Sequence, residues 1–78
     1  MGKTIDVFKG AGWHKYTIDE FKEEFNFSSE IDYENIFEVV VHRDWLKIAY
    51  RMNGDDTPCN IKVRIYDKVF GTYVLSNT

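Results

Sequence analysis

Side chains that commonly act as nucleophiles, general bases or zinc ligands are few in this chain and far apart. The 78 residues include His14, His42 and Cys59, whereas zinc sites usually carry paired Cys or His at short spacing. Catalysis by the thiol would require a lowered thiol pKa, and the nearby Asp55 and Asp56 would raise it. We therefore expect no enzyme activity, no metal site and no cofactor.

Recognition by charge is a second kind of chemistry, and an acidic segment indicates it. Residues 19–38 carry eight acidic side chains against one lysine, although the whole chain has a net charge of only −3. Two acidic pairs lie at i, i+4 spacing, where like charges on a helix repel by roughly 0.2–0.5 kcal/mol. A solvated helix face is the ordinary explanation, but mixed charges would have been more stable. We predict a surface for a basic protein partner, formed by Asp19, Glu20, Glu23, Glu24, Glu30, Asp32 and Glu34.

The polar face of an expected β-hairpin carries cations and aromatic rings. Residues 45–52 and 60–66 alternate between apolar and polar side chains, which is the pattern of half-buried strands. Single-stranded nucleic acid binds to such faces because cations follow its phosphates and its bases stack on aromatic rings. Cationic faces are also common on ordinary strands. The alternative function is therefore single-stranded nucleic-acid binding through Trp45, Lys47, Arg51, Lys62, Arg64 and Tyr66.

One helix and several strands must position these side chains. Thr17 and Glu20 have the spacing of a capping box, which predicts a helix that runs to about Phe27, with Phe21 and Phe25 on its apolar stripe. Alternation and turn residues predict strands at 4–9, 13–16, 36–42, 45–52, 60–67 and 68–76, the last with a bulge or bend at Gly71.

The predicted fold is α+β, with residues 1–78 as a single compact domain. One antiparallel sheet of four to six strands carries one helix on its apolar face, in the order ββαβββ(β). In the hairpin of residues 45–66, the apolar faces coincide only if the numbers of opposed residues sum to an odd number. Sums of 111 or 113 fit the loop; the first pairs Lys47 with Arg64 and Trp45 with Tyr66, and the second pairs Arg51 with Lys62. Either one places two cations opposite each other, which is unfavourable.

Cysteine content and hydropathy bear on where the protein works. A single cysteine allows no intramolecular disulfide, which favours a reducing compartment. Neither a signal peptide nor an apolar run long enough to cross a membrane is apparent. We expect a cytoplasmic, non-enzymatic interaction protein, monomeric or homodimeric. Small proteins of this kind often act as stoichiometric inhibitors or adaptors, including many that phages and mobile elements encode.

Overall fold

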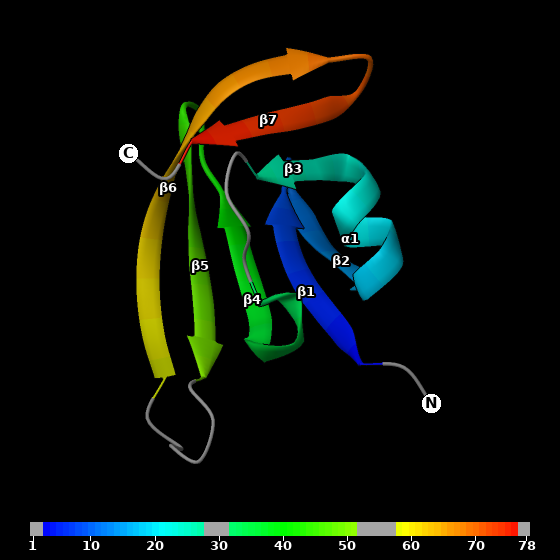
Figure 1. Ribbon diagram of the computed structural model, residues 1–78, viewed down its shortest axis with the longest axis vertical. Coiled ribbons are helices and arrows are strands. Elements are labelled where there is room, and N and C mark those ends of the chain that lie inside the picture. Colours follow the sequence, from blue (N-terminus) through cyan, green and yellow to red (C-terminus); the bar gives the residue numbers. More distant parts are fainter. Residues whose placement is uncertain (1–2, 28–31, 52–57, 77–78) are drawn as a thin grey trace.

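A single curled sheet and one short helix make up the part of the chain that the computed structural model describes, residues 3–27, 32–51 and 58–76 (Figure 1). Within these residues the sheet has seven strands, in the order β2-β1-β4-β5-β6-β7-β3. The strands are β1 (Thr4–Lys9), β2 (Gly12–Thr17), β3 (Phe25–Phe27), β4 (Ile36–Val41), β5 (Trp45–Arg51), β6 (Pro58–Val69) and β7 (Thr72–Ser76). The helix α1 spans Ile18–Glu24, and a 3-10 turn, η1, spans Tyr33–Asn35.

The sheet is mixed, so the predicted antiparallel sheet of four to six strands is wrong. β1 pairs with β4 in parallel, and β3 pairs with β7 in parallel. Parallel neighbours need a long crossover connection, and β2, α1 and β3 together provide one between β1 and β4. The chain leaves β2 at one edge of the sheet, passes through α1 and returns as β3 at the other edge (Figure 1).

The helix begins as predicted but ends earlier. The Thr17 hydroxyl accepts the Glu20 amide at 3.1 Å, and the Glu20 carboxylate accepts the Thr17 amide at 2.9 Å, which confirms the capping box. α1 ends at Glu24 because Phe25–Phe27 pair with β7 as a strand. Strand alternation then buries both phenylalanines, at Phe25 and Phe27.

The segment predicted as one strand from 68 to 76 is divided between two strands. β6 continues to Val69, and a two-residue turn at Phe70 and Gly71 leads into β7. The two turn residues have φ angles of 51° and 84°, as the type I′ turn of a tight hairpin requires. Gly71 therefore lies in a turn and not in a bulge.

A β-bulge interrupts the alternation of buried and exposed residues along β4. The β4–β5 register shifts between Ile36 and Glu38, so Phe37 is the extra residue. Ile36 and Val39 are consequently both buried, although strict alternation would place them on opposite faces. β4 is not an edge strand, since it lies between β1 and β5.

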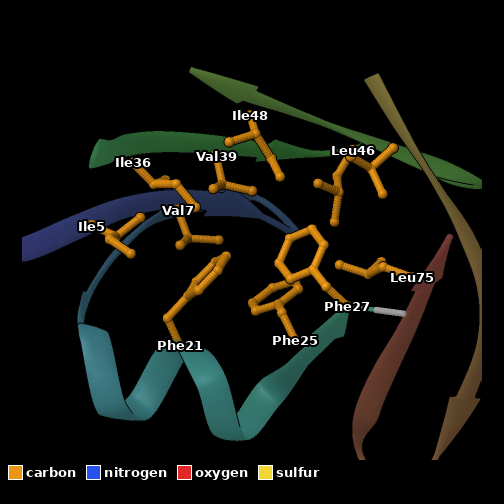
Figure 2. Packing of buried hydrophobic residues seen from close by; sticks show 11 residues of the cluster. Ile5, Val7, Phe21, Phe25, Phe27, Ile36, Val39, Leu46, Ile48 and Leu75 are labelled. Carbon is orange, nitrogen blue, oxygen red and sulfur yellow. The ribbon is translucent and has the colours of Figure 1, made fainter. Parts of the chain in front are cut away.

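The core fills the space between the sheet and α1, where phenylalanines from α1 and β3 meet aliphatic side chains from the long strands (Figure 2). Phe21 stacks on Phe25 with ring centroids 4.6 Å apart, and Phe25 stacks on Tyr73 at 5.0 Å. The buried cluster consists of Ile5, Val7, Phe21, Phe25, Phe27, Ile36, Val39, Leu46, Ile48, Val63 and Leu75.

The β5–β6 hairpin has the predicted parity but a different register. Trp45 faces Arg64, and Lys47 faces Lys62, so opposed residue numbers sum to 109, which is odd as expected. The predicted sums were too large because β6 begins at Pro58 and not at Asn60. Proline is tolerated as the first residue of a strand. The expectation that two cations would oppose each other is confirmed.

Candidate functional site

The acidic side chains of α1 differ in whether the fold already provides partners for them. Asp19, Glu20 and Glu23 are exposed, while Glu24 is partly buried. Within the described residues, the carboxylates of Asp19 and Glu23 have no ion pair and no hydrogen bond. Asp19 and Glu23 also lie one helical turn apart, so their mutual repulsion is unrelieved.

Glu24 instead fastens the helix to the β1–β2 hairpin. Its carboxylate accepts hydrogen bonds from Lys9 at 2.7 Å and from the Tyr16 hydroxyl at 2.8 Å. Burial works to lower the pKa of Lys9, but its hydrogen bonds outweigh this effect and the pKa is raised. Burial also raises the pKa of Tyr16, together with the bond to Glu24. Glu24 thus has a structural role, and its contact with a partner stays a prediction.

Glu20 has a mixed role. Its carboxylate is fully exposed, and the backbone hydrogen bond from Thr17 lowers its pKa. One of its oxygens is therefore engaged in the capping box, while the negative charge still faces solvent.

Of the remaining predicted acids, Asp32 caps η1 and Glu34 lies within it. Asp32 uses both carboxylate oxygens within η1, accepting from the Glu34 amide at 3.2 Å and from the Asn35 side chain at 2.8 Å. Between η1 and the helix acids lies Lys22, whose ammonium sits 5.1 Å from the centre of the Tyr33 ring. Glu34 is exposed, and the predicted contact at Glu30 lies outside the described residues.

A groove beside α1 contains a residue that sequence reasoning missed. The tip of the β6–β7 hairpin lies against the end of the helix, where the Thr72 hydroxyl donates to the Glu23 carbonyl at 3.2 Å. At this tip the Phe70 side chain is fully exposed. We call the resulting hollow the acidic groove; it has a volume of about 360 Å³ and is lined by Tyr16, Glu20, Glu23, Glu24, Phe70, Gly71 and Thr72.

One signal in the sequence could have revealed Phe70. Two-residue hairpin turns strongly prefer Asn-Gly or Asp-Gly, and Phe70-Gly71 stands between two strand-like segments. The glycine marks the turn, so the residue before it is placed at the tip, where an aromatic side chain is unusual.

The cationic residues of β5 and β6 lie together on the outer face of the sheet. Lys47 faces Lys62 directly, and both are exposed, as is Arg64. None of the three takes part in an ion pair with another described residue. An open depression of about 660 Å³, the cationic groove, is lined by Asp44, Trp45, Lys62, Arg64, Ile65, Tyr66 and Ser76.

The aromatic residues of this face are not equivalent. Trp45 stacks on His42 at 3.9 Å, and the Lys62 ammonium lies 4.3 Å from its ring centre, so its indole is already in contact with other side chains. Tyr66 occupies a β-bulge between β6 and β7 and is 75% exposed, which leaves its ring open. The pairing of Trp45 with Tyr66, which the predicted sum of 111 implies, is wrong, since Trp45 faces Arg64.

Arg51 lies apart from this groove. It faces Pro58 at the far end of β5, and its guanidinium lies 4.8 Å from the centre of the Phe37 ring. The structure therefore brings together five of the six predicted nucleic-acid contacts and separates Arg51 from them.

Comparison with known proteins gives no relative for this chain. No protein-family model, no curated protein and no solved structure matches it. In the part of the chain that the structure describes, no helix has the length and apolar character needed to cross a membrane. Among the same residues, no three His, Cys, Asp or Glu side chains gather as a metal-binding group. Function is therefore inferred from the acidic and cationic surfaces.

Proposed function

We propose that this protein is a non-catalytic binding domain that acts on a protein partner as a stoichiometric inhibitor or adaptor, through the acidic surface of α1. One observation carries the proposal. Glu24 has a cation at 2.7 Å, whereas the exposed carboxylates of Asp19 and Glu23 have no ion pair and no hydrogen bond with another described residue. The fold thus compensates the charge of Glu24, which holds the helix, and leaves the charges of Asp19 and Glu23 uncompensated.

A basic partner would convert this local repulsion into attraction. Complementary charges across an interface accelerate association and select against wrong partners, and the effect weakens as salt rises. Lys9 and Tyr16 hold α1 on the sheet through Glu24, so the acidic surface is presented on a fixed element and little ordering is needed on binding.

Affinity capture from the native host tests the proposal, with Glu23→Lys as the variant and Asp44→Lys as its matched control. Both substitutions reverse one exposed acid, but Asp44 lies in the cationic groove. We expect a protein that the wild type retains after nuclease treatment to be lost with the Glu23 variant and kept with the Asp44 variant. Equal retention by all three proteins would refute the acidic surface as the binding site.

Binding of single-stranded nucleic acid is the second candidate, and a specific observation favours it. Lys47 and Lys62 face each other with Arg64 beside them, and stability alone would favour opposite charges at that cross-strand pair. The exposed ring of Tyr66 next to these cations offers a base-stacking face.

Titration of a labelled oligothymidylate would decide this second candidate. Three phosphate contacts predict a slope of log K against log salt of about −2 for a single strand. A Lys62→Glu/Arg64→Glu variant should lose binding, while Lys15→Glu, which changes an exposed lysine on β2, should weaken it little. Absence of binding at about 50 mM salt, or binding that ignores salt, would eliminate this function.

A further inference from the structure

Phe70 is unfavourable for the isolated protein in two independent ways. Its φ of 51° places a bulky residue in the left-handed region, which Asn and Gly occupy far more readily. Its ring is also fully exposed to water, where an apolar side chain gains nothing from burial. A single change to asparagine would remove both disadvantages while keeping the hairpin turn.

The position of Phe70 connects it with the acidic surface. The hydrogen bond from Thr72 to the Glu23 carbonyl holds the hairpin tip against the last turn of α1. Phe70 therefore lies along the same groove as the carboxylates of Glu20 and Glu23. Glu24, the third carboxylate of the groove, is paired with Lys9, so the negative charge left without a cation belongs to Glu20 and Glu23.

We propose that the acidic groove binds an arginine side chain from a basic segment of the partner, with Phe70 as the stacking face and Glu23 and Glu20 as the counter-charges. This inference rests on the proposed function and names the group that its surface recognises. A guanidinium stacks on aromatic rings and presents several donors to carboxylates at once, whereas an ammonium is more strongly hydrated. The groove is open, with the Phe70 ring fully exposed, so a side chain of the partner can reach it from solvent.

A nuclear magnetic resonance titration tests the assignment. The probe is a short capped peptide of alternating glycine and arginine, compared with peptides that carry lysine or glutamine in place of arginine. We expect the arginine peptide to shift the amide signals of Glu23, Gly71 and Thr72 and to bind more tightly than the lysine peptide. Binding of the glutamine peptide as tight as that of the arginine peptide would overturn the arginine assignment.

Three variants separate the contributions of the ring and the charge. Phe70→Asn should weaken binding of the arginine peptide about threefold to fivefold, because the cation–π contact is lost. Glu23→Gln should weaken it by a similar factor. Tyr66→Ala removes an exposed aromatic side chain of β6 that lies outside the groove, and it should leave binding unchanged.

Loss of binding in Phe70→Asn cannot be ascribed to unfolding, since this variant is expected to melt a few degrees above the wild type. If it bound the peptide as well as the wild type while Glu23→Gln did not, the role of Phe70 would be refuted and the acidic surface would stand. If the Glu23→Lys variant captured the same host protein as the wild type, the acidic surface itself would be refuted, whatever the peptide result.

Discussion

Lys9 donates to the Glu24 carboxylate at 2.7 Å, across 15 residues of sequence, and so joins the end of β1 to the last turn of α1. About a quarter of each side chain remains exposed, so solvent weakens the pair without removing it. We expect Glu24→Gln to lower the free energy of unfolding by about 1 kcal/mol, as measured by urea denaturation. The loss should shrink in concentrated salt; a loss that salt leaves unchanged would mean that the Tyr16 hydrogen bond matters more than the ion pair.

The capping box predicts a pH dependence at the start of α1. Because the Thr17 backbone amide donates to its carboxylate and the nearby Thr17 hydroxyl adds to this effect, the pKa of Glu20 lies below the ordinary value of 4.5. A carboxyl group with a lowered folded-state pKa stabilises the fold above its unfolded pKa, and that contribution disappears as pH falls through the folded pKa. Titration by nuclear magnetic resonance should find the Glu20 pKa below 4.5 in the wild type. It should rise in Thr17→Ala, and an unchanged pKa would contradict the hydroxyl contribution.

The Lys47–Lys62 pair predicts a stabilising substitution on the cationic face. Replacing Lys47 by glutamate converts a cross-strand repulsion into an attraction, which is worth about 0.2–1 kcal/mol on a sheet. Urea denaturation at low and high salt should find the variant more stable than the wild type, with the difference falling as salt rises. A destabilised variant would mean that Lys47 contributes more through packing of its stem than it costs through charge.

Phe21 is the central residue of the core in energetic terms. It is fully buried, stacks on Phe25 and makes a T-shaped contact with Tyr33, with the ring centroids 5.9 Å apart. Phe21→Ala should cost about 3–5 kcal/mol, most of the stability that a domain of this size is expected to have. The near-ultraviolet circular dichroism of the Phe21→Ala variant should be lost or greatly reduced. Phe8→Ala is a suitable comparison, since Phe8 is only partly buried and should cost less.

Features that depend on neighbours in sequence were predictable. The spacing of Thr17 and Glu20 correctly placed the start of α1, and the alternation along 45–51 correctly paired β5 with β6 through faces of matching character. The acidic and cationic surfaces followed from the same alternation and helical spacing. Their separation into engaged and free side chains did not, because it depends on contacts that spacing does not reveal: Lys9 lies 15 residues from Glu24, and His42 stacks on Trp45 from the connection between β4 and β5.

Features that depend on distant partners were not predictable. Phe25 fits a helical stripe after Phe21 and equally fits a strand with Phe27, and only the presence of β7 beside it decides for the strand. Tyr66 alternates regularly with Arg64, yet a bulge leaves it unpaired in the ladder. Gly71 marks Phe70 as the residue before a turn, but the place of Phe70 beside the helix acids depends on contacts between α1 and β7, which are remote in sequence.

The passage of α1 from one edge of the sheet to the other has a consequence for how this protein folds. β3 pairs with β7, and Thr72 reaches the Glu23 carbonyl across 49 residues of sequence. Contacts of such long range must overcome a large loop-closure entropy before they contribute any stability. During synthesis on the ribosome, α1 and β3 emerge before β7. Phe25 and Phe27 would therefore lack their partner strand until β7 has emerged. We expect slow folding for so small a domain, with the exposed phenylalanines as the surface that a chaperone would meet first.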